Sequence, residues 1–395
     1  MKHSKLILPV IVISQFCCTS LWFAGNGVIN DLVTDFGLED SALGHLTSAV
    51  QFGFIIGTLV FAILTIADRF SPSMVFLISA LLASLLNLGV IWEANSLMSL
   101  LSLRFFTGFF LAGIYPVGMK IATDYYEKGL GKSLGFLVGA LVIGTAFPHL
   151  LKEMTGDYPW KFVLIATSLL SVVGGLMMMI MVPDGPFRKS SQKIELSAFL
   201  NIFQNRSFRS VSFGYFGHMW ELYAFWAFVP FMLSKYSLEH SNVLFNVPLL
   251  SFLIIGLGGL ACVLSGYLGQ AAGTKKVAIV CLLLSSVCCV LSPLVFYSES
   301  GVVFVGFLLF WGLVVIADSP LLSTLVAQNA SAEIKGTALT IVNSLGCSIS
   351  IISIQLITFL MELTDSNAIY TILAAGPILG LLSLRRLKSS VSLSF

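Results

Sequence analysis

The sequence predicts an all-α membrane protein with twelve transmembrane helices in two six-helix bundles. Three observations lead to this fold class. Of the 395 residues, 57% are hydrophobic and only 10% are charged, whereas soluble domains carry about 25% charged residues. The apolar residues fall in runs of about 20, the length that crosses a bilayer as a helix. These runs divide six and six around the longest hydrophilic stretch. A soluble globule and a β-barrel, whose strands are about 10 residues long and alternate, are both excluded.

The twelve runs are read as helices because a helix satisfies its own backbone hydrogen bonds in lipid. In chain order they cover residues 6–28, 42–66, 73–92, 97–121, 131–151, 162–182, 210–233, 244–269, 277–297, 302–326, 336–360 and 367–384. The hydrophilic stretch between the sixth and seventh runs opens with the helix-breaking sequence Pro-Asp-Gly-Pro. We therefore expect an N-terminal bundle over residues 1–182, a cytoplasmic central loop over 183–209 and a C-terminal bundle over 210–395.

The positions of the basic residues predict the orientation in the membrane. If the N-terminus is cytoplasmic, 16 of the 21 Lys and Arg residues lie on the cytoplasmic side and only Lys152, Lys161 and Lys235 on the other. The first outer loop, Asp31 to Asp40, carries four acids and no base. Cytoplasmic loops of membrane proteins are enriched in Lys and Arg. We therefore expect a multi-pass protein of the cell inner membrane with both termini in the cytoplasm.

Weak internal repetition supports two related bundles. Pro116 in the fourth run lies 204 residues before Pro320 in the tenth, and Asp68 after the second run lies 202 before Gln270 after the eighth. Gly131 at the start of the fifth run corresponds in the same way to the start of the eleventh. Parallel repeats of this kind place a central site between the two halves.

The loop after the second run carries part of a family pattern, GxxxDRxGRR. Asp68 and Arg69 match it. The other pattern positions are occupied by Leu64, Ser71, Pro72 and Ser73. With the six-plus-six arrangement, this loop resembles that of the major facilitator superfamily, and the resemblance covers essentially the whole chain. In that family the loop helps latch the halves in one access state. The resemblance therefore implies a conformational latch at Asp68 and Arg69.

The fourth run contains Arg104 followed by small residues, which is similar to a second family pattern. Arg104 is about eight residues into its helix, so a lipid-facing position would be costly. The resemblance implies a role in proton transfer or substrate binding. The antiporter pattern of the fifth run ends in GPxxGG, but here Pro148 is followed by His149. This departure weakens the case for a drug or proton antiporter.

Two further acidic residues lie deep in the predicted membrane. Glu221, near the middle of the seventh run, shares a helix face with His218, three residues earlier. A carboxylate at that depth is costly unless it is paired. We expect proton coupling at Glu221, with a neutral Glu hydrogen-bonded between helices as the alternative. Asp318 in the tenth run precedes Pro320, which permits a kink that turns a polar residue toward protein or water.

Polar and aromatic residues at helical spacing mark the cavity-facing sides of the helices. The resemblance implies that the first, fourth, seventh and tenth helices surround a central cavity, with interhelical packing as the alternative for each residue. Substrate or proton-coupling residues are then Arg104, His218, Glu221 and Asp318. The expected cavity lining is Gln15, Trp22, Asn26, Gln51, Tyr115, Tyr223, Trp226 and Asn343.

These features predict a secondary transporter of a small solute that works by alternating access and is coupled to protons. A proton-driven efflux antiporter for drugs or metabolites, or a uniporter, are the alternatives. No GxxxxGK[ST] phosphate-binding loop occurs, so P-loop coupling to ATP is excluded. An intramembrane enzyme is disfavoured because no HExxH motif occurs and the five histidines are dispersed. We expect no cofactor, no metal and no nucleic-acid partner, and a monomer in the bilayer. Arg104 and the aromatic residues favour an organic anion or zwitterion.

Overall fold

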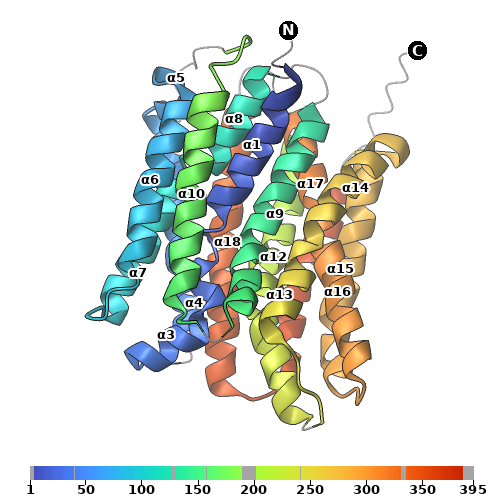
Figure 1. Ribbon diagram of the computed structural model, residues 1–395. Coiled ribbons are helices and arrows are strands. Elements are labelled where there is room, and N and C mark those ends of the chain that lie inside the picture. Colours follow the sequence, from blue (N-terminus) through green and yellow to red (C-terminus); the bar gives the residue numbers. More distant parts are fainter. Residues whose placement is uncertain are drawn as a thin grey trace.

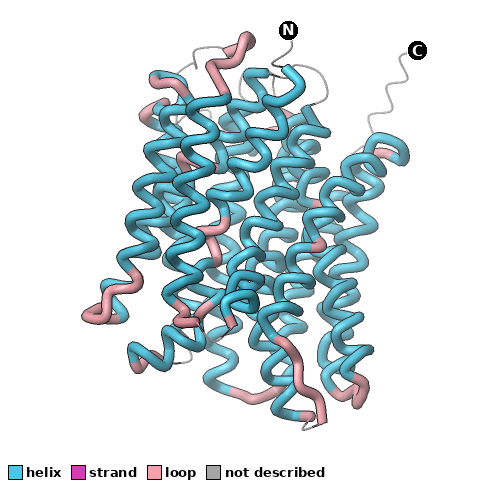
Figure 2. Tube along the Cα trace, in the orientation of Figure 1, coloured by secondary structure: helices cyan, strands magenta, loops and turns pink. Residues whose placement is uncertain are grey.

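The computed structural model describes residues 4–39, 41–125, 130–156, 158–188, 202–240, 242–330 and 335–385. These residues form one bundle of long helices that run roughly side by side, with no strand in the described ranges (Figures 1 and 2). The two ends of the chain lie at the same end of the bundle, which is called the termini side below (Figure 1). The all-α prediction is confirmed.

The N-terminal set of helices follows the first six predicted spans. Its members are α1 (Ser4–Thr19), α2 (Ala24–Gly27), α3 (Ile29–Phe36), α4 (Ala42–Ile63), α5 (Ile66–Arg69), α6 (Pro72–Gly89), α7 (Leu97–Leu111), α8 (Tyr115–Tyr125), α9 (Leu130–Thr155) and α10 (Lys161–Met181). Pro72 stands at the first position of α6, where its missing N–H has no helical partner to lose. Ser96 and Ser99 form a reciprocal capping box at the start of α7.

The C-terminal set follows the other six spans. It consists of η1 (Ile202–Gln204), α12 (Arg206–Glu239), α13 (Val247–Gly256), α14 (Gly258–Ala272), α15 (Thr274–Phe296), α16 (Gly301–Ala317), α17 (Ser319–Asn329), α18 (Lys335–Leu363), η3 (Asn367–Ala374) and α19 (Ala375–Arg385). α12 extends beyond the predicted run at both ends. Its start is stabilised by Asn205, whose side chain accepts hydrogen bonds from the N–H groups of Ser207 and Phe208.

Several predicted spans are interrupted helices. The first span breaks between α1 and α2, and the chain then enters α3, so the first outer loop is partly helical rather than open. α3 buries Leu32, which gives this short helix an apolar contact with the bundle. The tenth span divides at Asp318 into α16 and α17, with Pro320 near the start of α17. The helix is thus interrupted by one residue, two positions before the proline that was predicted to permit a kink.

Ten helical segments of the described chain are long and apolar enough to cross a membrane, and four of these segments each join two of the helices given above. α12 is not among them, and it carries His218 and Glu221 among its buried residues. α1 contributes only a shorter apolar helix, Leu6–Thr19. Large apolar side chains such as Leu85, Ile180 and Leu294 are exposed on the outside of the bundle. The protein is a multi-pass membrane protein.

The two sets of helices meet along two seams. In one, α9 packs against α13 and α14, and a Cβ on Gly139 would lie only 3.0 Å from the carbonyl oxygen of Gly259. In the other, α4 packs against α18. There Ser350 donates to Gln51 at 2.7 Å, and the amide of Gln355 donates to Ser48 at 2.8 Å. Glycines and a few polar bonds thus lie at these seams beside buried apolar residues, to which both sets of helices contribute.

Candidate functional site

A buried acid–base pair lies where the tenth span is broken. Asp318 separates α16 from α17, and His218 reaches it from α12. His218 Nδ1 lies 2.7 Å from Asp318 Oδ1, and each side chain is 1% exposed. The Asp318 carbonyl accepts the backbone N–H of Leu322 at 2.8 Å, so the start of α17 is built on the same residue. The site thus joins an ionisable pair to a helix break.

Glu221 occupies a different environment from His218, although the two are three residues apart on α12. Its Oε1 accepts a hydrogen bond from Trp311 Nε1 at 2.6 Å and from the Cys289 thiol at 3.2 Å. Its Oε2 accepts from Ser285 Oγ at 2.9 Å. These donors lie on α15 and α16, so the carboxylate is held entirely within the C-terminal set. His218 and Glu221 therefore point to separate partners.

Arg104 is buried against the break in the first span. Its guanidinium donates to the carbonyl oxygens of Leu21 at 3.3 Å and Trp22 at 2.5 Å, and to Asn87 Oδ1 at 3.3 Å. The side chain is 2% exposed. All of these acceptors, which belong to the described part of the chain, are uncharged. Arg104 therefore bonds to carbonyls of the turn that follows α1, and none of these partners is a carboxylate.

Aromatic side chains connect the broken first span to α12. Trp22 stacks on Tyr223 with ring centroids 5.8 Å apart and an interplanar angle of 21°. Phe23 meets Trp226 edge to face at 6.3 Å, and Tyr223 contacts Trp226 at 5.4 Å. Trp22 also packs against Phe54 of α4. Trp22 and Phe23 lie in the turn between α1 and α2, and Tyr223 and Trp226 lie on α12, so these aromatic contacts bridge the two sets of helices.

Several buried polar atoms near this bridge have no hydrogen-bond partner among the described residues. Such atoms are rare in folded proteins, and buried indole N–H groups usually find an acceptor. The predicted lining residues with such atoms are Gln15 (Nε2 and Oε1), Trp22 (Nε1), Gln51 (Nε2) and Trp226 (Nε1). His149 Nε2 of α9 and His218 Nε2 also have no hydrogen-bond partner among the described residues. Both sets of helices thus contain buried polar atoms without a described partner.

A small cavity of about 30 Å³ lies between the two sets, with Tyr115 of α8 on one wall and Pro320 of α17 on another. Tyr215 and Asn343 also line it, and the Tyr215 hydroxyl donates to Asn343 Oδ1 at 3.0 Å. This space can hold at most a few water molecules. The two sets therefore close around this space in the described conformation.

The predicted site residues divide among these groups. Asn26 donates to Thr47 at 2.8 Å within the N-terminal set, and Gln51 bonds to α18 at the seam. The described contacts pair Asp318 with His218, and they bring neither Glu221 nor Arg104 to Asp318. Sequence reasoning missed the three donors to Glu221. Of these, Trp311 is a large residue with an N–H in the otherwise apolar helix α16, and that was the only signal.

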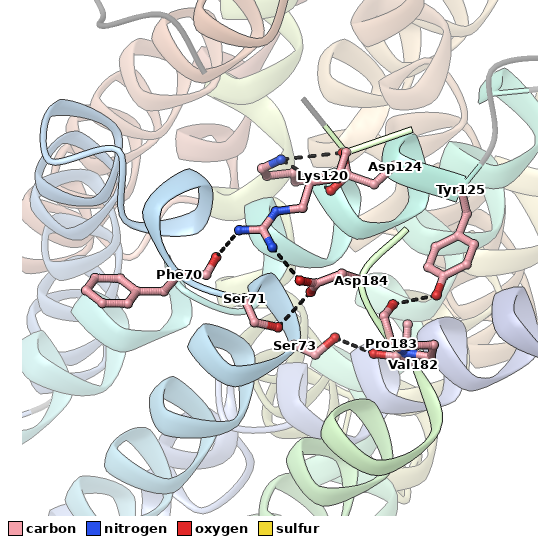
Figure 3. Close-up of polar contacts among 10 residues, drawn as sticks. Phe70, Ser71, Ser73, Lys120, Asp124, Tyr125, Val182, Pro183 and Asp184 are labelled. Carbon is pink, nitrogen blue, oxygen red and sulfur yellow. Dashed lines mark hydrogen bonds and ion pairs between the residues drawn. The ribbon is translucent and has the colours of Figure 1, made fainter. Parts of the chain in front are cut away.

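The predicted latch is only partly described. The Asp68 side chain lies outside the described part of the structure, and Arg69 donates through Nε to the Thr65 hydroxyl at 3.1 Å in its own turn. Figure 3 shows a second set of contacts at the same loop, made by residues that follow α10. Ser71 donates to Asp184 at 2.7 Å, and Arg188 donates to the carbonyl of Phe70 at 2.8 Å. Sequence reasoning did not assign a role to Asp184 or Arg188.

Comparisons with known proteins agree with this architecture. Residues 11–354 match the Major Facilitator Superfamily. A stretch of 163 residues is 26% identical to the 4-hydroxybenzoate transporter PcaK of Pseudomonas aeruginosa, covering 39% of this chain and 34% of that protein. The match thus spans about a third of that relative's length.

Solved structures share the fold over nearly the whole chain. The human organic anion transporter MFSD10 (TETRAN) has a TM-score of 0.72 and 15% identity, covering 96% of this chain and 99% of its own. The proton:xylose symporter XylE has a TM-score of 0.74 and 13% identity, covering 98% and 96%. A bacterial homologue of the human lysosomal transporter Spinster has a TM-score of 0.67 and 14% identity, covering 98% and 95%. Because the family match extends over most of the chain, this protein belongs to the major facilitator superfamily of membrane transporters and is a carrier rather than an enzyme.

Proposed function

We propose that this chain is a proton-coupled secondary transporter of a small organic anion, working by alternating access with its two six-helix bundles moving about a central site. The observation that carries the proposal is the ionisable pair His218–Asp318, fully buried at the break between α16 and α17. An intramembrane ionisable residue marks a proton or substrate pathway because it is too costly to keep without a role.

The position of the pair suggests how a proton would act. A charged Asp318 attracts a protonated His218, and a proton added to Asp318 removes that attraction. Asp318 also accepts the first backbone hydrogen bond of α17, next to Pro320. A change at its carboxyl group is therefore made at the joint of a broken helix, which is a natural hinge. In this proposal, protonation of Asp318 changes the position of α17 relative to α12.

Glu221 receives a structural role in this proposal. Both of its oxygens are already bonded by three donors from one set of helices. Trp311 can only donate, so it holds Glu221 Oε1 as an acceptor. A group held in this way within one bundle has little reason to exchange a proton as the bundles move. The coupling first expected at Glu221 is therefore assigned to Asp318 and His218.

The substrate class follows from the centre of the bundle. Arg104 is a buried cation with only neutral partners in the described structure, so a bound anion would lower its electrostatic cost. The Trp22–Tyr223 stack, with one ring on each bundle, could open to admit a planar ring, and the indole N–H groups of Trp22 and Trp226 could bond to its polar group. The relatives described above include a 4-hydroxybenzoate transporter and an organic anion transporter. We infer an organic acid with an aromatic ring as the substrate.

The proposed placement is the cell inner membrane, with the termini side in the cytoplasm. It is supported by the concentration of Lys and Arg on that side. The two seams carry polar bonds and glycines, which support a bundle movement because such contacts can be broken and remade at low cost.

The test is transport into proteoliposomes of purified protein with radiolabelled 4-hydroxybenzoate as the probe, with and without an imposed pH gradient. We expect saturable uptake, counterflow, and accumulation only when the gradient is present. Benzoate should compete. Cyclohexanecarboxylate, which lacks the aromatic ring, and 4-hydroxybenzyl alcohol, which lacks the negative charge, should compete poorly. Saturable flux that ignores the gradient would overturn proton coupling.

A further inference from the structure

A groove of about 500 Å³ runs along the seam between α4 and α18. Its floor is one face of α4, formed by His45, Ala49 and Phe52. Residues of α7 form one wall and residues of α18 form the other, so both sets of helices contribute to the groove. Pockets that take molecules of drug size have volumes of about 300 to 1,000 Å³. The groove therefore has the size of a binding site.

The floor of the groove faces away from the centre of the bundle. The central face of α4 carries Thr47 and Phe54, which contact the broken first span. Ala49 and Phe52 each lie two positions from one of these residues, which places them about 160° around the helix. Phe52 is 52% exposed. Because α4, α7 and α18 all belong to segments able to cross a membrane, the groove opens to the hydrocarbon of the bilayer.

The groove lies in the leaflet opposite the termini side. α4 begins at that end of the bundle (Figure 1), and its 22 residues rise about 33 Å, close to the thickness of the hydrocarbon core. His45 is the fourth residue of α4, and Phe52 lies about 10 Å further in. There Phe52 contacts Phe105 of α7, with ring centroids 5.6 Å apart. The groove thus runs from the headgroup level toward the midplane, in the direction of an acyl chain.

A hydrogen bond between the two sets lies beside the groove. Gln355 of α18 and Ser48 of α4 both line it. The Gln355 amide donates to Ser48 Oγ at 2.8 Å and to the Gly44 carbonyl at 3.1 Å. Hydrogen bonds are stronger in surroundings of low dielectric constant than in water. An apolar chain in the groove would keep water from these bonds and so strengthen the seam.

The occupant of the groove comes from the bilayer, of which phospholipid is the main component. The hydrophobic effect does not drive a lipid chain into the groove, because lipid tails are as apolar as Leu side chains. Close contact does, because atoms that line an unfilled space lose their dispersion contacts. A chain in the groove touches α4 and α7 of one set and α18 of the other. It therefore binds best while the sets are joined here, and it shifts the equilibrium toward that conformation.

We propose that the groove binds one acyl chain of a phospholipid from the leaflet opposite the termini side, and that this chain stabilises the joined form of the α4–α18 seam. The site is separate from the central aromatic residues and from the His218–Asp318 pair. The inference rests on the membership in a family of membrane carriers and is independent of the proposed substrate and of proton coupling.

The first test asks whether a chain occupies the groove. Protein in proteoliposomes is photolabelled with a phosphatidylcholine that carries a diazirine in the middle of one acyl chain, and the labelled peptides are identified by mass spectrometry. We expect about tenfold more label on the peptides with Phe52 and Ile351 than on the peptide with Leu85, the ratio given by roughly ten additional atomic contacts. Leu85 is the matched control, because it is 67% exposed near the end of α6 in the same leaflet.

Variants that fill the groove sharpen this test. Ala49→Phe should remove the excess label from α4 and α18 and leave the label at Leu85 unchanged. Ala49→Leu, a smaller addition, should remove part of the excess. Equal labelling of the groove and of Leu85 in the wild type would disprove a bound chain. Stronger labelling of the groove by a free fatty acid with the same diazirine would show that its ligand is not a phospholipid.

The second test asks whether the chain stabilises the seam, and it needs no substrate. A cysteine at Asn26 reports opening on the side opposite the termini through its rate of labelling by a membrane-impermeant maleimide, corrected for the native cysteines. In phospholipid with methyl-branched chains, which fill a narrow groove less well than straight chains, labelling should be about fivefold faster, as for loss of one hydrogen bond.

The same variants separate the groove from the bulk properties of the bilayer. Ala49→Phe fills the groove in both lipids, so its labelling rate should be the same in both. Leu85→Phe adds a ring outside the groove and should respond to the lipids as the wild type does. If Ala49→Phe responds as strongly as the wild type, or the wild type does not respond, the stabilising role is wrong. Ala49→Leu takes the place of Ala49→Phe if the larger side chain lowers the melting temperature.

Discussion

His218 and Asp318, a hundred residues apart in the chain, face one another at 2.7 Å between Nδ1 and Oδ1 with each side chain 1% exposed. A His–Asp pair differs from an Arg–Asp pair because both members can become neutral. The buried pair thus has a charged and an uncharged form, and the helix break at Asp318 lies directly beside it. This combination leads to the first prediction.

Replacing Asp318 with Asn should abolish accumulation driven by a pH gradient while leaving counterflow of bound substrate. Asn keeps the size of the side chain and can still bond to His218, but it cannot take up a proton in the working pH range. Removing one member of a buried ion pair costs about 3 to 5 kcal/mol when the other stays charged. An imidazole also has a neutral form, so we expect a smaller loss of stability. Asp365→Asn, an exposed residue, is the control.

Replacing Glu221 with Gln should act on stability rather than on coupling. The Gln oxygen can still accept from Trp311 and Cys289, but the Ser285 hydroxyl must turn to accept from the amide NH2 and donate to the Leu282 carbonyl. Exchanging the hydrogen bonds of a carboxyl group for those of an amide costs about 1 kcal/mol. We expect a lower melting temperature and intact gradient-driven accumulation. Ser285→Ala should show a smaller decrease in the same direction. If Glu221→Gln were stable but uncoupled, the assignment of coupling to Asp318 would be incorrect.

The comparison of these two acids shows what the sequence could predict. Apolar runs and isolated charges are local features, so the spans and the depth of Arg104, Glu221 and Asp318 could be recognised from them. The partner of each charge depends on which helices pack together, which a single sequence does not specify. Residues three apart on a helix lie on one broad face, yet His218 and Glu221 still reach different neighbours.

Helix breaks show the same limit. Pro320 predicted the interruption of the tenth span because proline removes a backbone donor. The break after Thr19 has no proline or glycine within it, since the chain there reads Ser-Leu-Trp-Phe. It is stabilised instead by Arg104, whose guanidinium donates to the carbonyls of Leu21 and Trp22. A break that depends on a side chain more than 80 residues away leaves no local signal.

The stack between Trp22 and Tyr223 should contribute to substrate affinity through its rings. Tyr223→Leu should weaken binding of 4-hydroxybenzoate by up to about tenfold, since an aromatic pair is worth about 0.5 to 1.5 kcal/mol. Tyr223→Phe keeps the ring and should bind nearly as well as the wild type. Isothermal titration calorimetry in detergent measures both. Equal losses in Leu and Phe would point to the hydroxyl and contradict a stacking role.

The effect of the positive charge of Arg104 should be separable from the effect of its hydrogen bonds. Arg104→Lys keeps the positive charge but bonds fewer of the carbonyls at the α1 break, and Arg104→Gln keeps some donors without the charge. If the buried charge attracts the anion, Lys should retain measurable affinity while Gln loses it. If Arg104 serves only to hold the broken helix, both variants should lose thermal stability and affinity together. Calorimetry and a melting curve on the same samples distinguish the two outcomes.

The seam between α4 and α18 should control opening on the side opposite the termini. A Cβ at Gly44 would overlap the Thr358 side chain, so Gly44→Ala must push the two helices apart or rotate Thr358. The same seam holds Gln51–Ser350 and Gln355–Ser48, which would be stretched as the helices separate. Loss of one such bond, at about 1 kcal/mol, changes an opening equilibrium by about fivefold.

We expect Gly44→Ala and Ser350→Ala to increase maleimide labelling of a cysteine at Asn26 by about fivefold. Gly306→Ala is the matched control, because no atom lies within 4 Å of the added methyl group. Labelling that rises equally in Gly306→Ala would mean that the effect comes from helix substitution itself and not from the seam.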